Sequence, residues 1–239
     1  MRLSAAVTRG WIAAHRARGR AARAAGRPEV DRETIVRSYA SGRSFLDVGC
    51  MWNVNGRIAF VAEEAGATAV TGVDVMPETP EFLAERSRRG SAVRYVGGDL
   101  HDPATLEAAG VHDVVWCSGV LYHAPNPVLT LERLRSVCGS TLLLATETLP
   151  DVPGLPGTCV LYPALDDTAR RAYAAAPGGR ALAVTEPYDP AAGYGNWFWG
   201  ITPSALDGLL RVAGFDPPVE RWWLSPFHLL VAAHPTERT

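Results

Sequence analysis

The chain has 239 residues, of which 47% are hydrophobic and 20% charged, so it holds enough apolar side chains to build one sizeable core. A formal net charge of −2 argues against general binding of polyanions, and no apolar run reaches the ~18 residues that a membrane helix needs. These features exclude extensive disorder and a membrane span, and the lack of a secretory signal pattern predicts a cytoplasmic protein. Four cysteines without CxxC spacing predict neither a disulfide framework nor a metal site.

The first 43 residues are expected to form an N-terminal helical arm. Residues 1–44 hold ten arginines and three acids, so a basic segment precedes an acidic remainder. All basic residues of the chain are arginine, which is typical of the codon usage of a GC-rich bacterial genome. An exposed, lightly amphipathic helix is expected over 3–25, with apolar side chains at helical spacing: Leu3, Val7, Trp11 and Ala14. Asp31 can cap a second helix, which ends at Ser41-Gly42.

After this arm, short β-rich runs alternate with helical ones, which predicts an α/β fold with a doubly wound, mostly parallel, Rossmann-like sheet. The expected strands are 44–48, 69–73, 92–96, 112–117 and 140–146. The expected helices between them are 56–65, 79–88, 103–109 and 127–137. The last two strand-like runs, 219–224 and 227–233, have no helix between them. They are therefore expected to pair antiparallel and to give the sheet an antiparallel C-terminal strand.

The alternation lapses over residues 149–200, where proline, glycine and tyrosine are frequent. We expect this segment to be a lid insertion within one domain of residues 44–239, with a short helix near 166–175. A further helix opens at Thr202-Pro203, because threonine is a good cap and proline suits the first helical position, and it ends at Gly214.

The most informative segment is Phe45-Leu-Asp-Val-Gly-Cys-Met-Trp-Asn-Val-Asn-Gly56, a buried strand that runs into a glycine-containing loop and then a helix. Such a turn places backbone N–H groups at the carboxyl edge of a parallel sheet, where doubly wound folds bind ligands. Asp47 stands directly before the loop, where its carboxylate would repel a pyrophosphate but suit a ligand with an ammonium and a sulfonium group. That charge pattern belongs to S-adenosylmethionine.

From the first strand onward, the sequence resembles the class I S-adenosylmethionine-dependent methyltransferases. Their first motif, an acid followed by spaced glycines, matches at Asp47 and Gly49, whereas Met51 and Asn53 replace later glycines. Gly56 is interpreted as the displaced glycine after a small insertion.

Two further acids strengthen the resemblance. Asp74 ends the second strand, where a carboxylate can accept both ribose hydroxyls, and it can also cap the following helix. Asp99 follows the third strand, at the position from which the family contacts the adenine amino group, with Leu100 available to pack on the ring. The cofactor-binding set implied by the resemblance is Asp47, Gly49, Gly56, Asp74, Asp99, Leu100 and Ser118.

The segment after the fourth strand indicates a subgroup of these methyltransferases. Gly119-Val-Leu-Tyr-His123 is similar to the signature of a subgroup that includes the tRNA wobble-uridine carboxymethyltransferases and many bacterial small-molecule methyltransferases. The subgroup has the Tyr-His pair of this signature at the reactive end of the cofactor. By this resemblance, Tyr122 and His123 are the candidate catalytic residues. His123 could take a proton from the acceptor, or Tyr122 could pack under the cofactor while His123 only bonds the backbone.

The candidate substrate-binding residues are Asn196, Trp197 and Trp199, at the end of the lid. Clustered aromatic rings can exclude water from the transferring methyl group, and equally they can cover the sheet edge. The remaining histidines show no ligand spacing and are expected to be structural or solvent-exposed: His101, His112, His228 and His234.

The leading prediction is therefore a methyltransferase that uses S-adenosylmethionine to methylate an oxygen or nitrogen of a small-molecule acceptor, in bacterial secondary metabolism. The subgroup signature and the basic arm support a weaker alternative, the modification of tRNA, although the arm could equally close the pocket or hold a homodimer together. A third interpretation is a catalytically inactive protein that binds the cofactor as a sensor or assembly partner, suggested by the replaced glycines at Met51 and Asn53.

Overall fold

The computed structural model describes residues 2–24, 30–174, 186–225 and 227–237. The α-helices of this part of the chain are α1 (Arg2–Ala24), α2 (Arg32–Ala40), α3 (Arg57–Glu64), α4 (Pro80–Arg89), α5 (Pro103–Ala109), α6 (Pro127–Val137), α7 (Asp167–Ala174) and α8 (Pro203–Val212). The strands are β1 (Ser44–Val48), β2 (Ala69–Asp74), β3 (Arg94–Gly97), β4 (His112–Ser118), β5 (Cys138–Glu147), β6 (Cys159–Leu161), β7 (Trp199–Ile201), β8 (Glu220–Ser225) and β9 (His228–Ala233). Short 3-10 turns are η1 (Leu121–His123), η2 (Tyr162–Ala164) and η4 (Pro190–Gly195).

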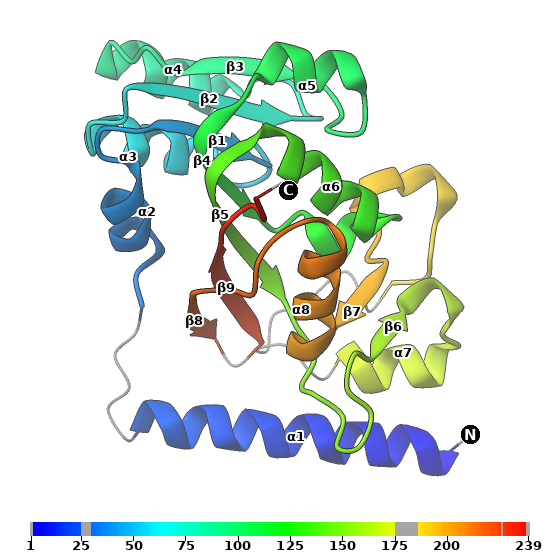
Figure 1. Cartoon of the computed structure of the whole chain (residues 1–239). Helices are drawn as coiled ribbons and strands as arrows, with labels where there is room; N and C mark the ends of the chain where they lie inside the picture. The colour runs from blue at the N-terminus through cyan, green and yellow to red at the C-terminus, as the bar shows by residue number, and fades with distance from the viewer. Residues whose placement is uncertain (1, 25–29, 175–185, 226, 238–239) are drawn as a thin grey trace.

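Seven of these strands form one sheet in the order β3-β2-β1-β4-β5-β9-β8 (Figure 1). The first five run parallel, whereas β9 pairs antiparallel with β5 and β8 pairs antiparallel with β9. The predicted doubly wound, mostly parallel sheet with antiparallel C-terminal strands is confirmed. The tight connection between β8 and β9 forces their antiparallel pairing, because a parallel pair needs a crossover of a dozen or more residues.

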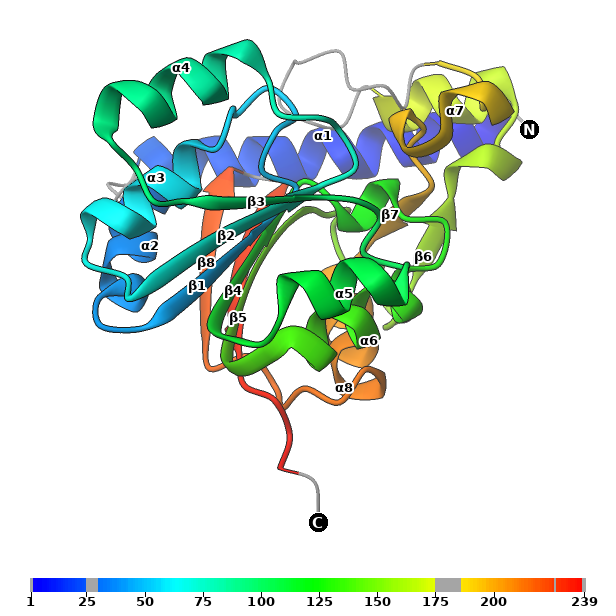
Figure 2. The ribbon, with the colours of Figure 1, turned by 90° about the horizontal axis from the view of Figure 1, so that it is seen from above.

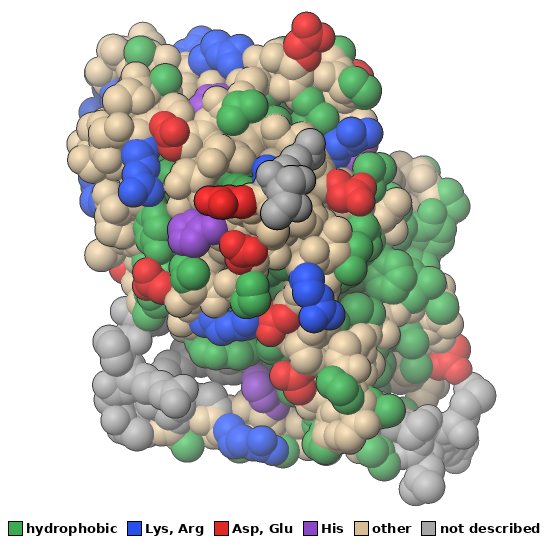
Figure 3. All heavy atoms as spheres, viewed as in Figure 1, with side chains coloured by type: hydrophobic (Ala, Val, Ile, Leu, Met, Phe, Trp, Pro, Cys, Tyr) green, Lys and Arg blue, Asp and Glu red, His purple; other side chains and the backbone are tan. Residues whose placement is uncertain are grey.

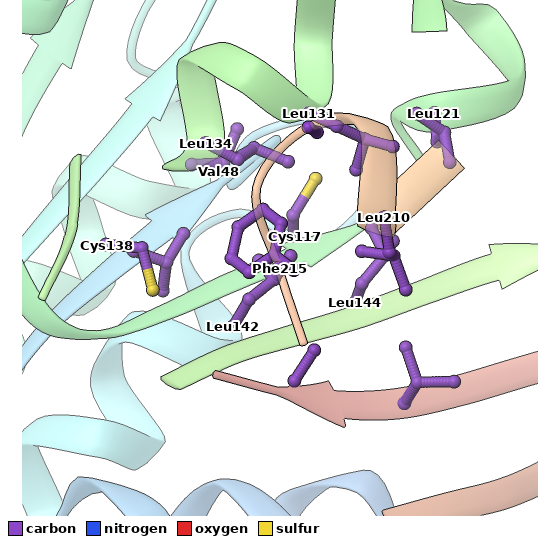
Figure 4. Packing of buried hydrophobic residues seen from close by; sticks show 14 of the residues in the cluster. Val48, Cys117, Leu121, Leu131, Leu134, Cys138, Leu142, Leu144, Leu210 and Phe215 are labelled. Carbon is purple, nitrogen blue, oxygen red and sulfur yellow. The ribbon is translucent and has the colours of Figure 1, made fainter. Parts of the chain in front are cut away.

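Helices cover both faces of the sheet, with α2, α3 and α4 on one side and α5, α6 and α8 on the other (Figure 2). Each layer has its own hydrophobic core. In the core beneath α6 and α8, Leu131 and Leu134 from α6 meet Leu142 and Leu144 from β5 (Figure 4). The central strands are buried on both faces, so their sequences read as continuous apolar runs.

The helix α1 differs from its sequence-based prediction. It packs against α7 and against Phe227 at the start of β9, so it is not simply exposed. The expected apolar face is only partly correct, since Trp11 takes part in this packing but Val7 is 66% exposed, whereas Ile12, outside the expected face, is 1% exposed. Helical spacing alone did not identify the buried face, because the helix has many small alanines and its contact surface depends on where α7 and Phe227 lie.

The predicted lid region, 149–200, contains α7 close to its expected position and a two-stranded antiparallel sheet of β6 and β7. This small sheet was not predicted, because each strand has only three residues and they lie far apart in the sequence. Leu149 N–H donates to the Ile201 carbonyl at 2.9 Å, which attaches the small sheet beside the end of β5. Part of the predicted lid, 175–185, lies outside the described residues.

Candidate active site

The strand order reverses between β1 and β4, and a cavity of about 480 Å³ lies at the carboxyl ends of the strands around this point. Open α/β sheets bind their ligands at such reversal points, because the connecting helices leave in opposite directions and open a crevice. The volume falls within the ~300–1,000 Å³ that small-molecule sites occupy. The lining includes residues from the ends of β1 to β5, the first residue of α2, the lid and the start of β9.

The loop after β1 depends on left-handed backbone at several positions. Gly49 has φ +79°, and a Cβ there would stand 2.6 Å from Val120 Cγ2, so only glycine fits at this edge of the cavity. Asn53 and Asn55 have φ values of 57° and 49°. Asparagine tolerates this conformation better than other residues with a side chain, so the loop turns without the family's later glycines.

Gly56 lies elsewhere in this loop and does not line the cavity. It caps α3 with φ 72°, and a Cβ there would be 2.4 Å from the ring of Phe82. Its N–H donates to the Cys50 carbonyl at 2.7 Å. The structure thus places Gly56 in a turning and packing position, not among the residues that face the candidate ligand.

Asp47 lies at the end of β1 and lines the cavity while being only 2% exposed. Its Oδ2 accepts a hydrogen bond from the Ala59 N–H at 3.0 Å. The pKa of Asp47 is raised to about 7, mainly by burial; the hydrogen bond from Ala59 lowers it and the nearby Asp74 carboxylate raises it. An anionic group in this position is short of a positive partner, which a ligand ammonium group would supply.

Asp74 ends β2 and lines the same cavity. Its Oδ2 accepts the Met51 N–H at 2.7 Å, and its Oδ1 accepts the Met76 N–H at 2.9 Å. The carboxylate therefore ties the loop after β1 to the loop after β2. Each carboxylate oxygen can accept two hydrogen bonds, so both oxygens keep the capacity to accept a ligand hydroxyl.

Asp99 stands in a hydrogen-bonded cluster that includes the lid. Its Oδ2 accepts the Tyr194 hydroxyl at 2.6 Å, and its Oδ1 accepts the His101 N–H at 2.8 Å. The His101 ring also contacts the Tyr194 hydroxyl through Nδ1 at 3.2 Å and Thr130 Oγ1 through Nε2 at 2.8 Å. The prediction that His101 is merely structural or exposed thus missed its place in the cavity lining, beside Leu100.

Tyr122 and His123 lie in η1, directly after β4, and both line the cavity with Ser118. His123 Nδ1 lies 2.8 Å from the Asn196 carbonyl oxygen. A carbonyl only accepts, so Nδ1 carries the hydrogen and Nε2 keeps its lone pair. Burial lowers the pKa of His123, which the hydrogen bond to Asn196 partly opposes, so the neutral and basic form prevails at neutral pH.

The predicted substrate-binding residues do not line this cavity. Trp197 stacks on Tyr122, with ring centroids 4.2 Å apart, and the Asn196 side chain donates to the carbonyls of Asp189 and Gly193. Trp199 Nε1 donates to the Pro125 carbonyl at 3.2 Å. Trp197 and the Asn196 carbonyl thus contact Tyr122 and His123 from outside the cavity lining. A sequence cannot show on which side of a neighbouring loop an aromatic ring will pack.

Further lining residues that sequence reasoning missed include Glu147, His228 and Arg32. Glu147, the last residue of β5, pairs in register with His228, the first residue of β9. His228 Nδ1 lies 3.0 Å from Glu147 Oε1. Arg32 is the one arginine or lysine among the described residues that line the cavity. Glu147 could have been noticed as a fourth acid at a strand end, but the 81 positions that separate it from His228 carry no spacing signal.

Residues 46–141 match the family model described as a methyltransferase domain. The chain has the class I S-adenosylmethionine-dependent methyltransferase fold. The solved N-terminal domain of EvdMO1, with S-adenosylhomocysteine bound, resembles it with a TM-score of 0.57 at 17% identity, over 87% of this chain and 82% of that one. The prediction of this fold is confirmed, and the family match confirms a methyltransferase domain over residues 46–141.

Curated relatives of this methyltransferase domain act on different acceptors. The ubiquinone biosynthesis O-methyltransferase of Vibrio parahaemolyticus is 36% identical over 97 residues, which cover 40% of this chain and 39% of the relative. The tRNA U34 carboxymethyltransferase of Shewanella frigidimarina is 33% identical over 131 residues, which cover 48% of this chain and 35% of the relative. The chain thus spans less than half the length of these relatives.

Proposed function

We propose that the protein is a methyltransferase that transfers the methyl group of S-adenosylmethionine to a hydroxyl or amine of a small-molecule acceptor. The observation that carries this proposal is Asp47, a carboxyl group buried in the cavity lining, whose pKa is raised because none of the causes that act on it is a cation. The cofactor supplies a methyl group on a sulfonium centre, which is already a good leaving group. The protein then has to align the acceptor, exclude water and, where necessary, remove a proton.

The described residues fit such a ligand. Asp47 would receive its ammonium group, and the spare lone pairs of Asp74 would accept its ribose hydroxyls. Gly49 permits close approach to the backbone, where a Cβ would clash with Val120. Leu100 supplies an apolar contact and Asp99 a polar one for the adenine end.

His123 is proposed as the base that takes the acceptor's proton. Its Nε2 keeps a free lone pair, because Nδ1 donates to Asn196, and burial lowers its pKa so that the ring is neutral at neutral pH. Tyr122, held by its stack on Trp197, provides the adjoining wall. Burial raises the pKa of Tyr122, and the Glu147 carboxylate raises it further, so Tyr122 stays protonated and acts as a hydrogen-bond donor.

A small acceptor is favoured over tRNA by the position of the basic arm. The helix α1 packs on α7 and Phe227 within the same chain, so one of its faces is already occupied. On the molecular face shown in Figure 3, arginine side chains are interspersed with Asp and Glu and do not form one basic patch. RNA binding relies mainly on clustered cations that neutralise phosphates.

The experiment combines calorimetry with a turnover screen. The purified protein should bind S-adenosylhomocysteine in preference to NAD, and labelled S-adenosylmethionine should transfer its methyl group to a small molecule in a bacterial extract. Replacement of His123 by Ala should lower turnover by ~10²-fold or more without changing cofactor affinity. Binding of NAD but not of either adenosyl ligand would overturn the proposal, and cofactor binding without any methyl transfer would instead support the inactive binding protein.

A further inference from the structure

Glu147 and His228 form a partly buried pair in the cavity lining, which the proposed mechanism does not use. Their side chains are 19% and 13% exposed, and Glu147 Oε1 lies 3.0 Å from His228 Nδ1. Both residues line the cavity together with Tyr122, and the charge of Glu147 acts on the Tyr122 hydroxyl. The pair therefore lies close to the candidate catalytic residues.

The outer atoms of this pair lack partners. Glu147 Oε2 and His228 Nε2 are both buried and have no hydrogen-bond partner among the described residues. Most buried polar atoms in folded proteins are hydrogen-bonded, since an unpaired one has lost its water without compensation. Two such atoms on one hydrogen-bonded pair in a cavity lining point to a partner that arrives with a ligand.

The pair is held on rigid backbone. Glu147 and His228 are direct cross-strand neighbours of β5 and β9, and the next residue, Thr148, donates its N–H to the Phe227 carbonyl at 2.6 Å. Behind the turn, Phe227 packs on Ile12 of α1. A pre-organised pair on strand ends is suited to recognising a ligand group with a defined direction.

The hydrogen-bonding character of the pair specifies its ligand. The Glu147–His228 contact runs through His228 Nδ1, and in the tautomer that carries its hydrogen there, Glu147 Oε2 and His228 Nε2 are both acceptors. Their ligand must therefore bring a donor, and an ether or ester oxygen would leave them unpaired. Aromatic side chains such as Trp52 and Tyr122 line the same cavity and suit a ring that carries this donor.

We infer that the Glu147–His228 pair is a recognition site for a second donor group of the acceptor, a hydroxyl on an aromatic ring, beside the group that is methylated at His123. This inference rests on the proposed function and deepens it, because it specifies the acceptor as a ring compound with at least two donor groups. An acceptor that lacks the second donor would be rejected, since its binding would leave two buried acceptors unpaired.

Phenol and anisole test this directly, because they share a ring and differ in whether the oxygen carries a hydrogen. Their affinities are to be measured on protein saturated with S-adenosylhomocysteine. Phenol should bind about 10-fold or more tightly than anisole. Replacement of His228 by Phe should abolish this preference. His234, a half-buried histidine just after the other end of β9 and outside the cavity lining, provides a matched control, and His234→Phe should retain the preference.

Nitrogen-15 NMR of histidine-labelled wild-type protein provides a second measurement that does not depend on the folding of a variant. Phenol should shift the His228 Nε2 resonance and anisole should not. Equal affinity for the two probes, a preference that survives His228→Phe, or a shift confined to His123 would each overturn the inference. Failure of S-adenosylhomocysteine to bind would instead overturn the proposed function, so the two failures are distinguishable.

Discussion

Asp47 is the residue whose charge state most directly links the cavity to its ligand. Its carboxylate is buried beside Asp74, and this burial raises its pKa to about 7. The unfolded chain would ionise Asp47 near its ordinary value of 3.8. The folded, ligand-free protein therefore binds a proton that the unfolded chain does not, and the contribution of Asp47 to stability falls as the pH rises from about 4 to about 7.

A ligand ammonium group requires the ionised form of Asp47. We expect binding of S-adenosylhomocysteine to release a proton below pH 7, and its affinity to rise with pH until about 7 and then level off. Calorimetry at pH 6 in two buffers with different ionisation enthalpies measures this release. The Asp47→Asn variant should bind more weakly and release no proton through this group, and identical proton release in the variant would show that another group titrates.

At the scale of structural elements, the contact between the lid and the loop after β3 is formed by Tyr194. Its hydroxyl donates to Asp99 and also lies near His101, so it covers the end of the cavity where we propose that the adenine binds. Burial raises the pKa of Tyr194, and the hydrogen bond to Asp99 adds to this effect, so the hydroxyl remains a donor at neutral pH. This contact predicts that the lid controls ligand exchange.

The Tyr194→Phe variant removes only the hydroxyl. A hydrogen bond to a charged group contributes about 1.5–3 kcal/mol, so the dissociation rate of S-adenosylhomocysteine should rise by about 10-fold or more. Stopped-flow fluorescence would follow this rate. Tyr188→Phe serves as a control, because Tyr188 is 47% exposed and its ring contact with Phe198 is kept. Equal dissociation rates for both variants would show that the Tyr194–Asp99 hydrogen bond does not control ligand exchange.

The attachment of α1 is another property at this scale. Deletion of residues 1–26 should leave a folded core, because the main sheet begins only at Ser44, but it should uncover α7 and Phe227. The lid should then be cut faster by proteases. Ile12→Ala should partly reproduce this effect and Val7→Ala should not, since Ile12 is buried and Val7 is exposed. Similar cleavage rates in the two point variants would contradict the observed packing face.

At the scale of the whole molecule, the distribution of charge bears on the choice of partner. With arginines interspersed among acids on the face shown in Figure 3 and with a packed α1, we expect tRNA to bind only non-specifically, with a dissociation constant of about 10⁻⁶ M or weaker at physiological salt. Deletion of residues 1–26 should change this affinity little. Filter binding at several salt concentrations would measure it. Tight binding that disappears with the arm would favour tRNA modification over the small-molecule proposal.

The arrangement of the sheet and the places of most strand-end acids were predictable from the sequence, because both depend on local patterns. Alternating apolar strands and helices specify a parallel sheet, and the carboxyl ends of parallel strands meet at one edge. The sequence therefore predicted that Asp47, Asp74 and Asp99 lie close together, and all three line the cavity. The GVLYH segment likewise placed Tyr122 and His123 at this edge.

Only the tertiary structure brought Glu147 and His228 together, turned Trp197 behind Tyr122 and joined Tyr194 to Asp99. These contacts depend on the register of an antiparallel pair and on the path of a long lid, neither of which leaves a periodic trace in the sequence. The buried face of α1 was decided in the same way, by the positions of α7 and Phe227. Local patterns thus determined the elements and the edge at which they meet, whereas contacts between distant segments decided which side chains share the cavity.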